Sequence, residues 1–187
     1  MTLLLLGVVL FAAVHLVPSL LPALKANVQA KATENGYKGI FSLLLLAALA
    51  MIILGWRSVQ PQYLYAPVAM LHTPAVALIM AALLLFVVSN RPSRIKQLVR
   101  HPQLTGVALW AFAHLLINGD NRSLVLFGGL LLWAVVEIVA INRRDGVWIK
   151  SPVPAWRSDV INVLVTAVVV ALLVMAHPWL AGVPVYW

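Results

Sequence analysis

The chain has 187 residues, of which 63% are hydrophobic and only 10% are charged. A soluble domain carries about 25% charged residues, so these side chains are too few to cover a soluble fold of this size. The formal charge of +8 does not indicate nucleic-acid binding, because the basic residues lie between long apolar runs and not on one polar face. The chain contains no cysteine, which excludes disulfides, thiolate metal sites, iron–sulfur clusters and covalently attached haem. This composition predicts an integral membrane protein.

Six apolar runs come close to the ~20 residues that a helix needs to cross ~30 Å of hydrocarbon. The third and fourth are short, so we expect them to pack inside the bundle or to extend into the linkers. Asp159 is expected to cap the sixth helix. The sequence therefore predicts an all-α fold, a polytopic membrane bundle of six transmembrane helices in one domain over residues 1–187. The runs cover residues 2–21, 40–56, 74–88, 102–117, 122–141 and 159–176.

The first run could instead be a signal peptide that is removed, but a signal peptide begins with a positively charged stretch. Residues 1–11 contain neither lysine nor arginine, so we expect this run to remain as a membrane helix.

The distribution of lysine and arginine predicts how the bundle is oriented. Eleven of the thirteen lie in the first, third and fifth linkers, and only Arg57 and Arg122 lie in the others. Because loops that remain in the cytoplasm hold the excess of positive charge, these three linkers should face the cytoplasm. Both termini should then face the periplasm, in a multi-pass protein of the bacterial inner membrane.

Two histidines lie within the apolar runs, where an ionisable side chain is costly and marks a candidate site. His15 lies in the first run and His114 in the fourth, each ~18–20 Å from the membrane face at which its helix begins. Two imidazoles that meet at one depth could ligate the iron of a haem from both sides. The alternative is that each imidazole is satisfied by a neighbouring hydroxyl or carbonyl.

Glu137 is the acidic residue within the fifth run. It could relay protons, orient a histidine, or pair with a basic linker residue, and we favour a pair with Arg143.

Two segments of the chain resemble the NnrU family most clearly. They read Arg-His-Pro-Gln-Leu-Thr-Gly at residues 100–106 and Leu-Trp-Ala-Phe-Ala-His at residues 109–114. Segments 11–15, 36–43 and 124–133 also match, so the resemblance covers nearly the whole chain in order. NnrU proteins are bacterial membrane proteins associated with denitrification and nitric oxide handling. They are similar to 15-cis-zeta-carotene isomerase, a membrane enzyme that contains haem b.

The resemblance implies a non-covalently bound haem b with His15 and His114 as its axial ligands. Trp110 would pack beside the haem, and Arg100 with His101, or Glu137, would contact a propionate. A redox or sensing role follows, with nitric oxide or a carotenoid as a possible ligand. The isomerase has a cysteine where this chain has Ala111, so a ligand switch between thiolate and imidazole is excluded here.

A rival resemblance concerns the Arg-His-Pro-x-x-x-Gly motif that begins at Arg100. This motif also occurs in membrane methyltransferases and sterol reductases, where it helps to hold a nucleotide-type cofactor. The methyltransferases add a pair of adjacent glutamates, whereas this chain has only the isolated Glu137. Three classes of function therefore remain: a haem redox or sensor protein, a haem-dependent isomerase of a polyene, and a membrane assembly protein without haem.

Overall fold

The structure is a computed structural model, and it describes residues 1–185. Apart from an isolated bridge between Tyr63 and Asp120, the regular structure in these residues is helical. Five helices are long and apolar enough to cross a membrane, and a sixth apolar helix is shorter. The predicted six-helix membrane bundle is thus confirmed. The helices are α1 (Thr2–Leu20), α2 (Pro22–Ser58), α3 (His72–Ser89), α4 (Pro102–Ile117), α5 (Asn121–Asp145) and α6 (Trp156–Ala181), with short 3-10 helices η1 (Ala69–Leu71) and η2 (Arg94–Gln97).

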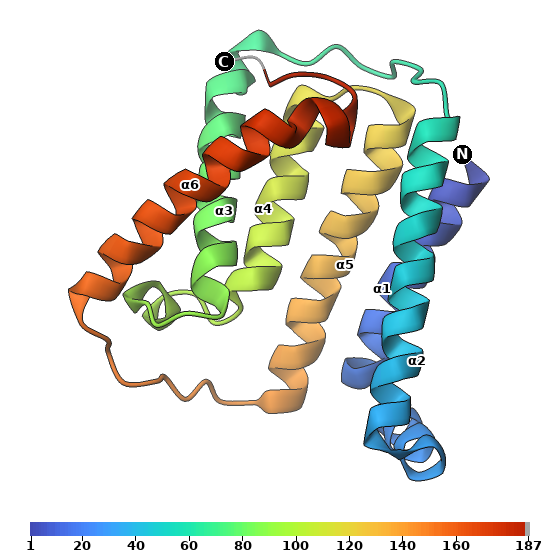
Figure 1. Cartoon of the computed structure of the whole chain (residues 1–187), viewed down its shortest axis with the longest axis vertical. Coiled ribbons are helices and arrows are strands. Elements are labelled where there is room, and N and C mark those ends of the chain that lie inside the picture. The colour runs from blue at the N-terminus through green and yellow to red at the C-terminus, as the bar shows by residue number, and fades with distance from the viewer. Residues whose placement is uncertain (186–187) are drawn as a thin grey trace.

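The helices pack one on the next in the spatial order α2, α1, α5, α4, α3 and α6. Figure 1 shows α5 between α4 and α1, while α6 crosses α3 at a slant. The start of α1 and the end of α6 lie at the same end of the molecule (Figure 1), as an even number of crossings requires. We call the opposite end, which carries the linkers rich in lysine and arginine, the basic end.

The first linker differs from the prediction because it is helical. Residues 22–39, expected as a polar connection, belong to α2. Within this helix Thr33 has φ 62° and ψ 169°, a conformation costly for a β-branched residue. The chain turns sharply there, and the Thr33 hydroxyl accepts a hydrogen bond from the Gly36 amide, as a residue that caps a new helix does. The linker is thus two helical pieces joined at a break.

The closest contact between helices is where α1 crosses α2. A Cβ atom built on Gly55 would lie 2.5 Å from the backbone nitrogen of Leu4, so only glycine fits there. A Cβ atom on Gly7 would lie 2.8 Å from the backbone nitrogen of Ile52 on the other helix. Leu4, Val8 and Ile52 form a buried apolar cluster around this crossing. Small residues that let two backbones approach are the usual means of packing membrane helices.

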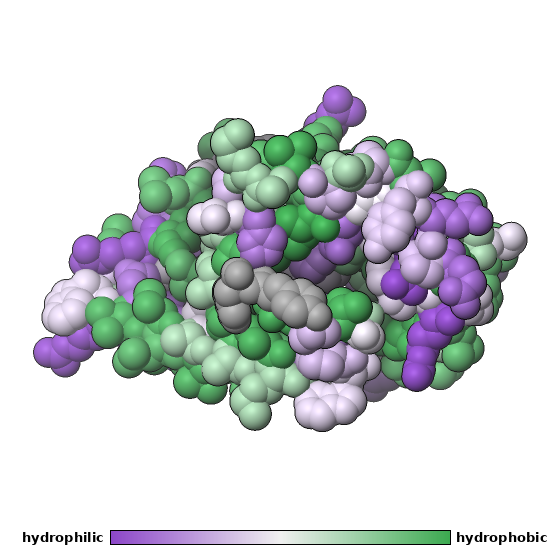
Figure 2. Space-filling model, turned by 90° about the horizontal axis from the view of Figure 1, so that it is seen from above, coloured by the Kyte–Doolittle hydropathy of each residue, from purple (hydrophilic) through white to green (hydrophobic). Residues whose placement is uncertain are grey.

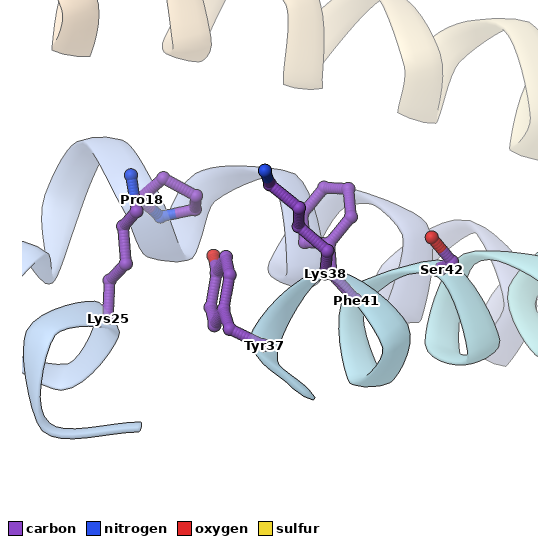
Figure 3. A pocket seen from close by; sticks show the side chains of 6 residues that line it. All are labelled: Pro18, Lys25, Tyr37, Lys38, Phe41 and Ser42. Atoms are coloured by element: carbon purple, nitrogen blue, oxygen red, sulfur yellow. The ribbon is translucent and has the colours of Figure 1, made fainter. Parts of the chain in front are cut away.

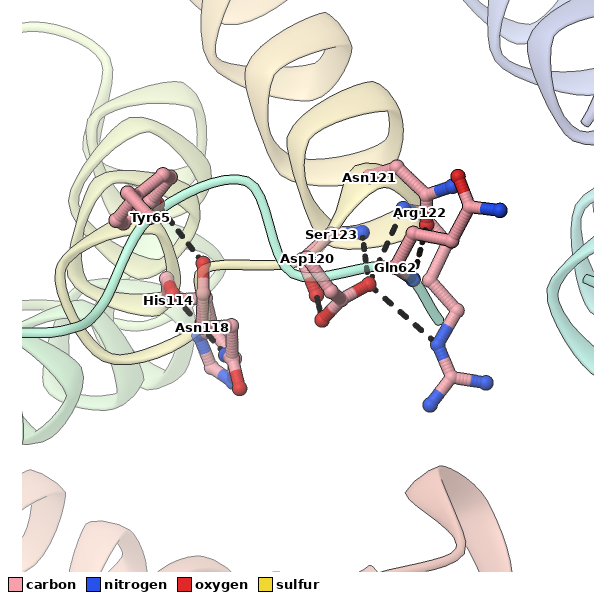
Figure 4. A network of polar contacts seen from close by, with 8 residues as sticks. All are labelled: Gln62, Tyr65, His114, Asn118, Asp120, Asn121, Arg122 and Ser123. Carbon is pink, nitrogen blue, oxygen red and sulfur yellow. Dashed lines mark hydrogen bonds and ion pairs between the residues drawn. The ribbon is translucent and has the colours of Figure 1, made fainter. Parts of the chain in front are cut away.

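Hydrogen bonds at the end opposite the basic end join the α2–α3 loop to the turn between α4 and α5 (Figure 4). The single hydroxyl hydrogen of Tyr65 is shared between the carbonyl oxygens of Leu115, in the last turn of α4, and Asn118, and Figure 4 shows the contact with Asn118. Asp120 caps α5 by accepting hydrogen bonds from the backbone amides of the second and third residues after it. The extended loop is therefore held across the outer ends of α4 and α5.

Asp159 does not cap α6, contrary to the prediction. The helix begins three residues earlier, at Trp156, and Asp159 instead accepts hydrogen bonds from the Ser93 hydroxyl and the Arg94 amide. A carboxylate that accepts from the start of a neighbouring helix satisfies amides that have no partner of their own. This contact joins α6 to η2 at the basic end.

The surface that faces away from the helix contacts is strongly apolar. Leu43, Leu132 and Leu164 are each more than 60% exposed, which fits contact with lipid. Seen along the bundle, apolar residues continue round the edge of the end face (Figure 2). The lipid bilayer is therefore the natural surrounding of these helices.

Candidate functional site

His15 lies on α1 with one ring nitrogen already bonded. Its Nδ1 atom is 2.9 Å from the carbonyl oxygen of Phe11, one turn earlier. Because a carbonyl oxygen only accepts hydrogen bonds, Nδ1 carries the hydrogen and Nε2 keeps its lone pair. The ring is half-buried among Phe11, Phe41 and Trp133, with centroid separations of 4.3, 5.6 and 4.9 Å. His15 thus presents a fixed imidazole with Nε2 available as an acceptor or a metal ligand.

His114 on α4 has the same local arrangement. Its Nδ1 donates to the carbonyl oxygen of Trp110 at 2.8 Å, again one turn earlier. The ring is stacked on Phe127 of α5, with centroids 4.4 Å apart, and lies 4.9 Å from the Trp110 ring. Trp110 itself meets Phe127 edge-on at 5.1 Å. The alternative predicted from the sequence, a carbonyl partner for each histidine, therefore holds for Nδ1 but leaves both Nε2 atoms available.

The two imidazoles do not face each other across a shared space. His15 packs against Trp133 and His114 against Phe127, and both aromatic residues belong to α5, which lies between α1 and α4. Phe127 and Trp133 are six positions apart, or about 9 Å along the helix axis. The expectation that the two rings meet at one depth is therefore wrong for this structure. The sequence patterns did not predict that Phe127 and Trp133 lie between the two histidines.

Glu137 has a partner that the sequence analysis did not choose. The Ser19 hydroxyl of α1 donates to Glu137 Oε1, and among the described residues no ion pair with Arg143 forms. Only 6% of Glu137 is exposed, and its second oxygen, Oε2, has no partner. Ser19 lies one turn beyond His15 on the same face of α1, but no signal in the sequence indicated that this face packs against α5.

A third group at the α1–α5 interface is also without a partner. The indole nitrogen of Trp133 is buried and makes no hydrogen bond. Trp133 lies one turn before Glu137, so an unpaired donor and an unpaired acceptor occur on the same face of α5. Together with the free Nε2 of His15, these two atoms are polar groups at the interface that have no hydrogen-bond partner among the described residues.

Arg100 and His101 are occupied at the basic end. Arg100 donates to the carbonyl oxygen of Gly146 at 2.8 Å, and His101 Nε2 lies 2.9 Å from the Asn142 side-chain oxygen. Both contacts join the start of α4 to the last turn of α5 and the residue that follows it. The Arg-His-Pro motif therefore connects two helix ends, and neither side chain is placed beside His15 or His114.

Two surface clefts lie beside the last turn of α1. The smaller, about 220 Å³, is lined by residues of α1 and α2 that include Lys25, Tyr37 and Phe41 (Figure 3). The larger, about 460 Å³, lies between α1 and α5. Neither is lined by His15 or His114, although Phe41 also contacts the His15 ring.

The donor atoms suit a haem, but their arrangement does not bring both to one iron. A neutral imidazole held by a bond from Nδ1 to a carbonyl is a good iron or zinc ligand. Within residues 1–185 no group of three or more histidine, aspartate or glutamate side chains could hold a metal ion; a haem iron needs only one or two protein ligands. As the structure stands, each histidine could serve as a single axial ligand.

Comparison with known proteins gives one match. No curated protein and no solved structure matches this chain. The family model described as NnrU protein matches residues 3–185, nearly the whole length. The chain therefore belongs to the NnrU family.

Proposed function

We propose that this protein is a haem b-binding protein of the bacterial inner membrane, with a redox or sensing role linked to denitrification and nitric oxide. His15 and His114 are its candidate axial ligands. The observation that supports this proposal is shared by both residues: Nδ1 donates to a carbonyl oxygen of the same helix, and Nε2 is left free. Such a bond fixes the tautomer and the ring direction, and it makes the imidazole a stronger ligand.

The residues around each imidazole supply the rest of the site. Aromatic rings on α1, α2 and α5 surround His15, and Trp110 with Phe127 flanks His114. Their role is to hold the ring still and to keep water from the free nitrogen. A haem bound there would supply an iron that changes oxidation state and binds small ligands such as nitric oxide.

The position of α5 favours a haem with one protein ligand over a haem with two. Trp133 and Phe127 separate the imidazoles, so both could reach one iron only if an aromatic side chain moved. If a single imidazole held the haem, the iron that the haem supplies would still be able to bind an external ligand. This arrangement fits sensing better than simple electron transfer, which needs no open position.

The sequence-based partners for the propionates are not part of this proposal. Arg100 and His101 are bonded to the end of α5, and Glu137 is an acid whose first oxygen accepts from Ser19. Ala111, which stands where the isomerase has cysteine, is fully buried. A haem site in this chain therefore depends on imidazole alone.

The experiment is to purify the protein from haem-replete cells and to record absorbance in the oxidised and reduced states. We expect a Soret band and a haem content near one per chain. His15→Ala and His114→Ala should each be compared with His72→Ala, a matched control at the start of α3, which should keep the spectrum. Loss of the band in one of the two variants identifies the ligand, and loss in both requires that α5 rearrange.

Two results would overturn the proposal, and a third would favour the isomerase. A chain that carries no haem after haem-replete expression would be a membrane assembly protein without haem. Retention of haem in the double variant of His15 and His114 would exclude both as ligands. Turnover of a poly-cis carotene by the haem-loaded protein would favour the isomerase over the sensor.

A further inference from the structure

The larger of the two clefts is a groove between the end of α1 and the last turns of α5. We call it the α1–α5 groove. It encloses about 460 Å³ and opens to the surface of the protein near the basic end. It is lined by Ser19 and Leu20 of α1 and by Val135, Val136, Val139, Ala140, Arg143 and Arg144 of α5.

The residues of α5 in the groove follow a regular pattern. They fall into two rows at a spacing of four, residues 135, 139 and 143 and residues 136, 140 and 144. Positions four apart lie above one another on a helix face. Each row therefore consists of two apolar residues followed by an arginine and extends about 12 Å along the helix axis. The groove is apolar along its length and cationic at one end.

The valines of the groove are only partly covered by the described part of the protein. Val135 and Val139 are 47% and 42% exposed, at a depth where α5 crosses the membrane. β-branched apolar side chains in that position are covered by acyl chains. The apolar part of the groove is therefore a surface along which an acyl chain can lie.

At the cationic end, one arginine side chain forms an ion pair and the other does not. Arg144 pairs with Asp145 through Nε at 2.7 Å and donates weakly to the Pro18 carbonyl oxygen. Arg143 is exposed, and no hydrogen bond or ion pair of its side chain occurs among the described residues. The buried acid Glu137 lies behind Ser19, which donates to it. The groove itself is lined by two cations and no acid.

We propose that the α1–α5 groove binds one anionic phospholipid from the leaflet at the basic end. An acyl chain would lie along the valines, and the phosphate would meet Arg143, with Arg144 beside it. An arginine fork matches phosphate oxygens in pairs, and basic pockets between membrane helices bind anionic head groups. This site goes beyond the proposed haem function and does not depend on it.

The smaller cleft, in Figure 3, is less suited to this ligand. Lys38 already pairs with Glu34 at 2.6 Å, and Lys25 lies over the Tyr37 ring, 6.0 Å from its centroid. Its volume is about half that of the α1–α5 groove. It also lacks the run of valines that would hold an acyl chain.

The test uses the full chain in nanodiscs made of equal parts phosphatidylglycerol and phosphatidylcholine. Native mass spectrometry then counts the lipids that each protein retains. We expect the wild type to retain phosphatidylglycerol in preference. One surface arginine contributes about 1 kcal/mol of attraction to an anionic lipid, so Arg143→Gln should weaken retention about fivefold. The matched control is Lys150→Gln with Arg157→Gln, which removes two exposed cations, one from the following linker and one from the first turn of α6, and should leave retention unchanged.

A second variant tests the apolar part without a change in charge. Val139→Trp fills the groove, whereas Val163→Trp places the same side chain on α6, at a position that is 56% exposed. The first should reduce retention of phosphatidylglycerol and the second should not. Equal retention of both lipids by the wild type would overturn the proposal. So would equal losses in the groove variants and their controls, because these would indicate general surface charge or general membrane contact.

Discussion

The crossing of α1 and α2 gives the most quantitative test of the fold. Gly55→Ala would place a Cβ atom 2.5 Å from the Leu4 nitrogen and 2.6 Å from its Cα. Non-bonded carbon contacts are comfortable at about 3.5–4.0 Å, so the helices must separate locally by about 1 Å. Overpacking of this kind costs about 1–3 kcal/mol, because Leu4, Val8 and Ile52 lose contact around the crossing.

Gly39→Ala is the matched control on the same helix. A Cβ atom at Gly39 would meet nothing within 4 Å, so only helix propensity changes, and it favours alanine by about 1 kcal/mol. The same gain offsets part of the cost at Gly55. We therefore expect Gly39→Ala to stabilise the protein by about 1 kcal/mol and Gly55→Ala to destabilise it by a net amount of up to ~2 kcal/mol.

The assay is reversible unfolding in mixed micelles, followed by tryptophan fluorescence, since Trp56 is adjacent to Gly55 and packs against the buried cluster. Equal shifts for the two variants in the same direction would show that propensity alone decides the outcome. Such a result would contradict the inference that α1 and α2 are in close contact at Gly55.

Three further predictions concern the polar contacts. Asp120→Ala removes the cap of α5 and should cost about 1 kcal/mol in the same unfolding assay, whereas Asp120→Asn should cost less. Burial, and then the charge of Asp120, raise the pKa of Tyr65 above its ordinary value of 10.0. The contribution of the Tyr65 contact to stability should therefore be complete below pH 10 and be lost as the pH rises through the raised pKa. The difference in ultraviolet titration between wild type and Tyr65→Phe should show a midpoint above pH 10. In a double-mutant cycle, Ser19→Ala and Glu137→Leu should be coupled by about 0.6–1.7 kcal/mol, and a coupling of zero would exclude their contact.

The fold could be predicted because membrane helices are encoded by composition. Runs of apolar residues gave six helices, and the structure has them. The ends were less certain, because a helix continues beyond its apolar run when polar residues also favour it. The stretch that contains Lys25 and Lys31 is rich in alanine and lysine, which are strong helix formers, so α2 extends into the expected linker. The break falls at Thr33, a residue type that caps helices, although the composition of the stretch favours one continuous helix.

The candidate residues could be selected from the sequence one by one, but their arrangement in space could not. An ionisable group within an apolar run identified His15, His114 and Glu137, and a local bond one turn away fixes each imidazole. Which residues lie between helices depends on which helices are neighbours, and a single sequence does not state this. The positions of Trp133 and Phe127 between the two histidines could not be predicted for that reason.

The difference in depth between the two histidines has a simple geometric cause. Both lie ~18–20 Å along their helices, but the distances start at opposite ends of the bundle. Equal distances from opposite ends meet at one level only if the helices are about 38 Å long. At 1.5 Å per residue, the 19 residues of α1 span ~28 Å and the 16 residues of α4 span ~24 Å. Each histidine has therefore passed the midpoint, His15 toward the basic end and His114 toward the opposite end. Helix length places the two imidazoles at different levels, and Trp133 and Phe127 of α5 lie between them. A single iron that joined them would therefore require a shift of α1 or α4 along α5 as well as movement of an aromatic side chain.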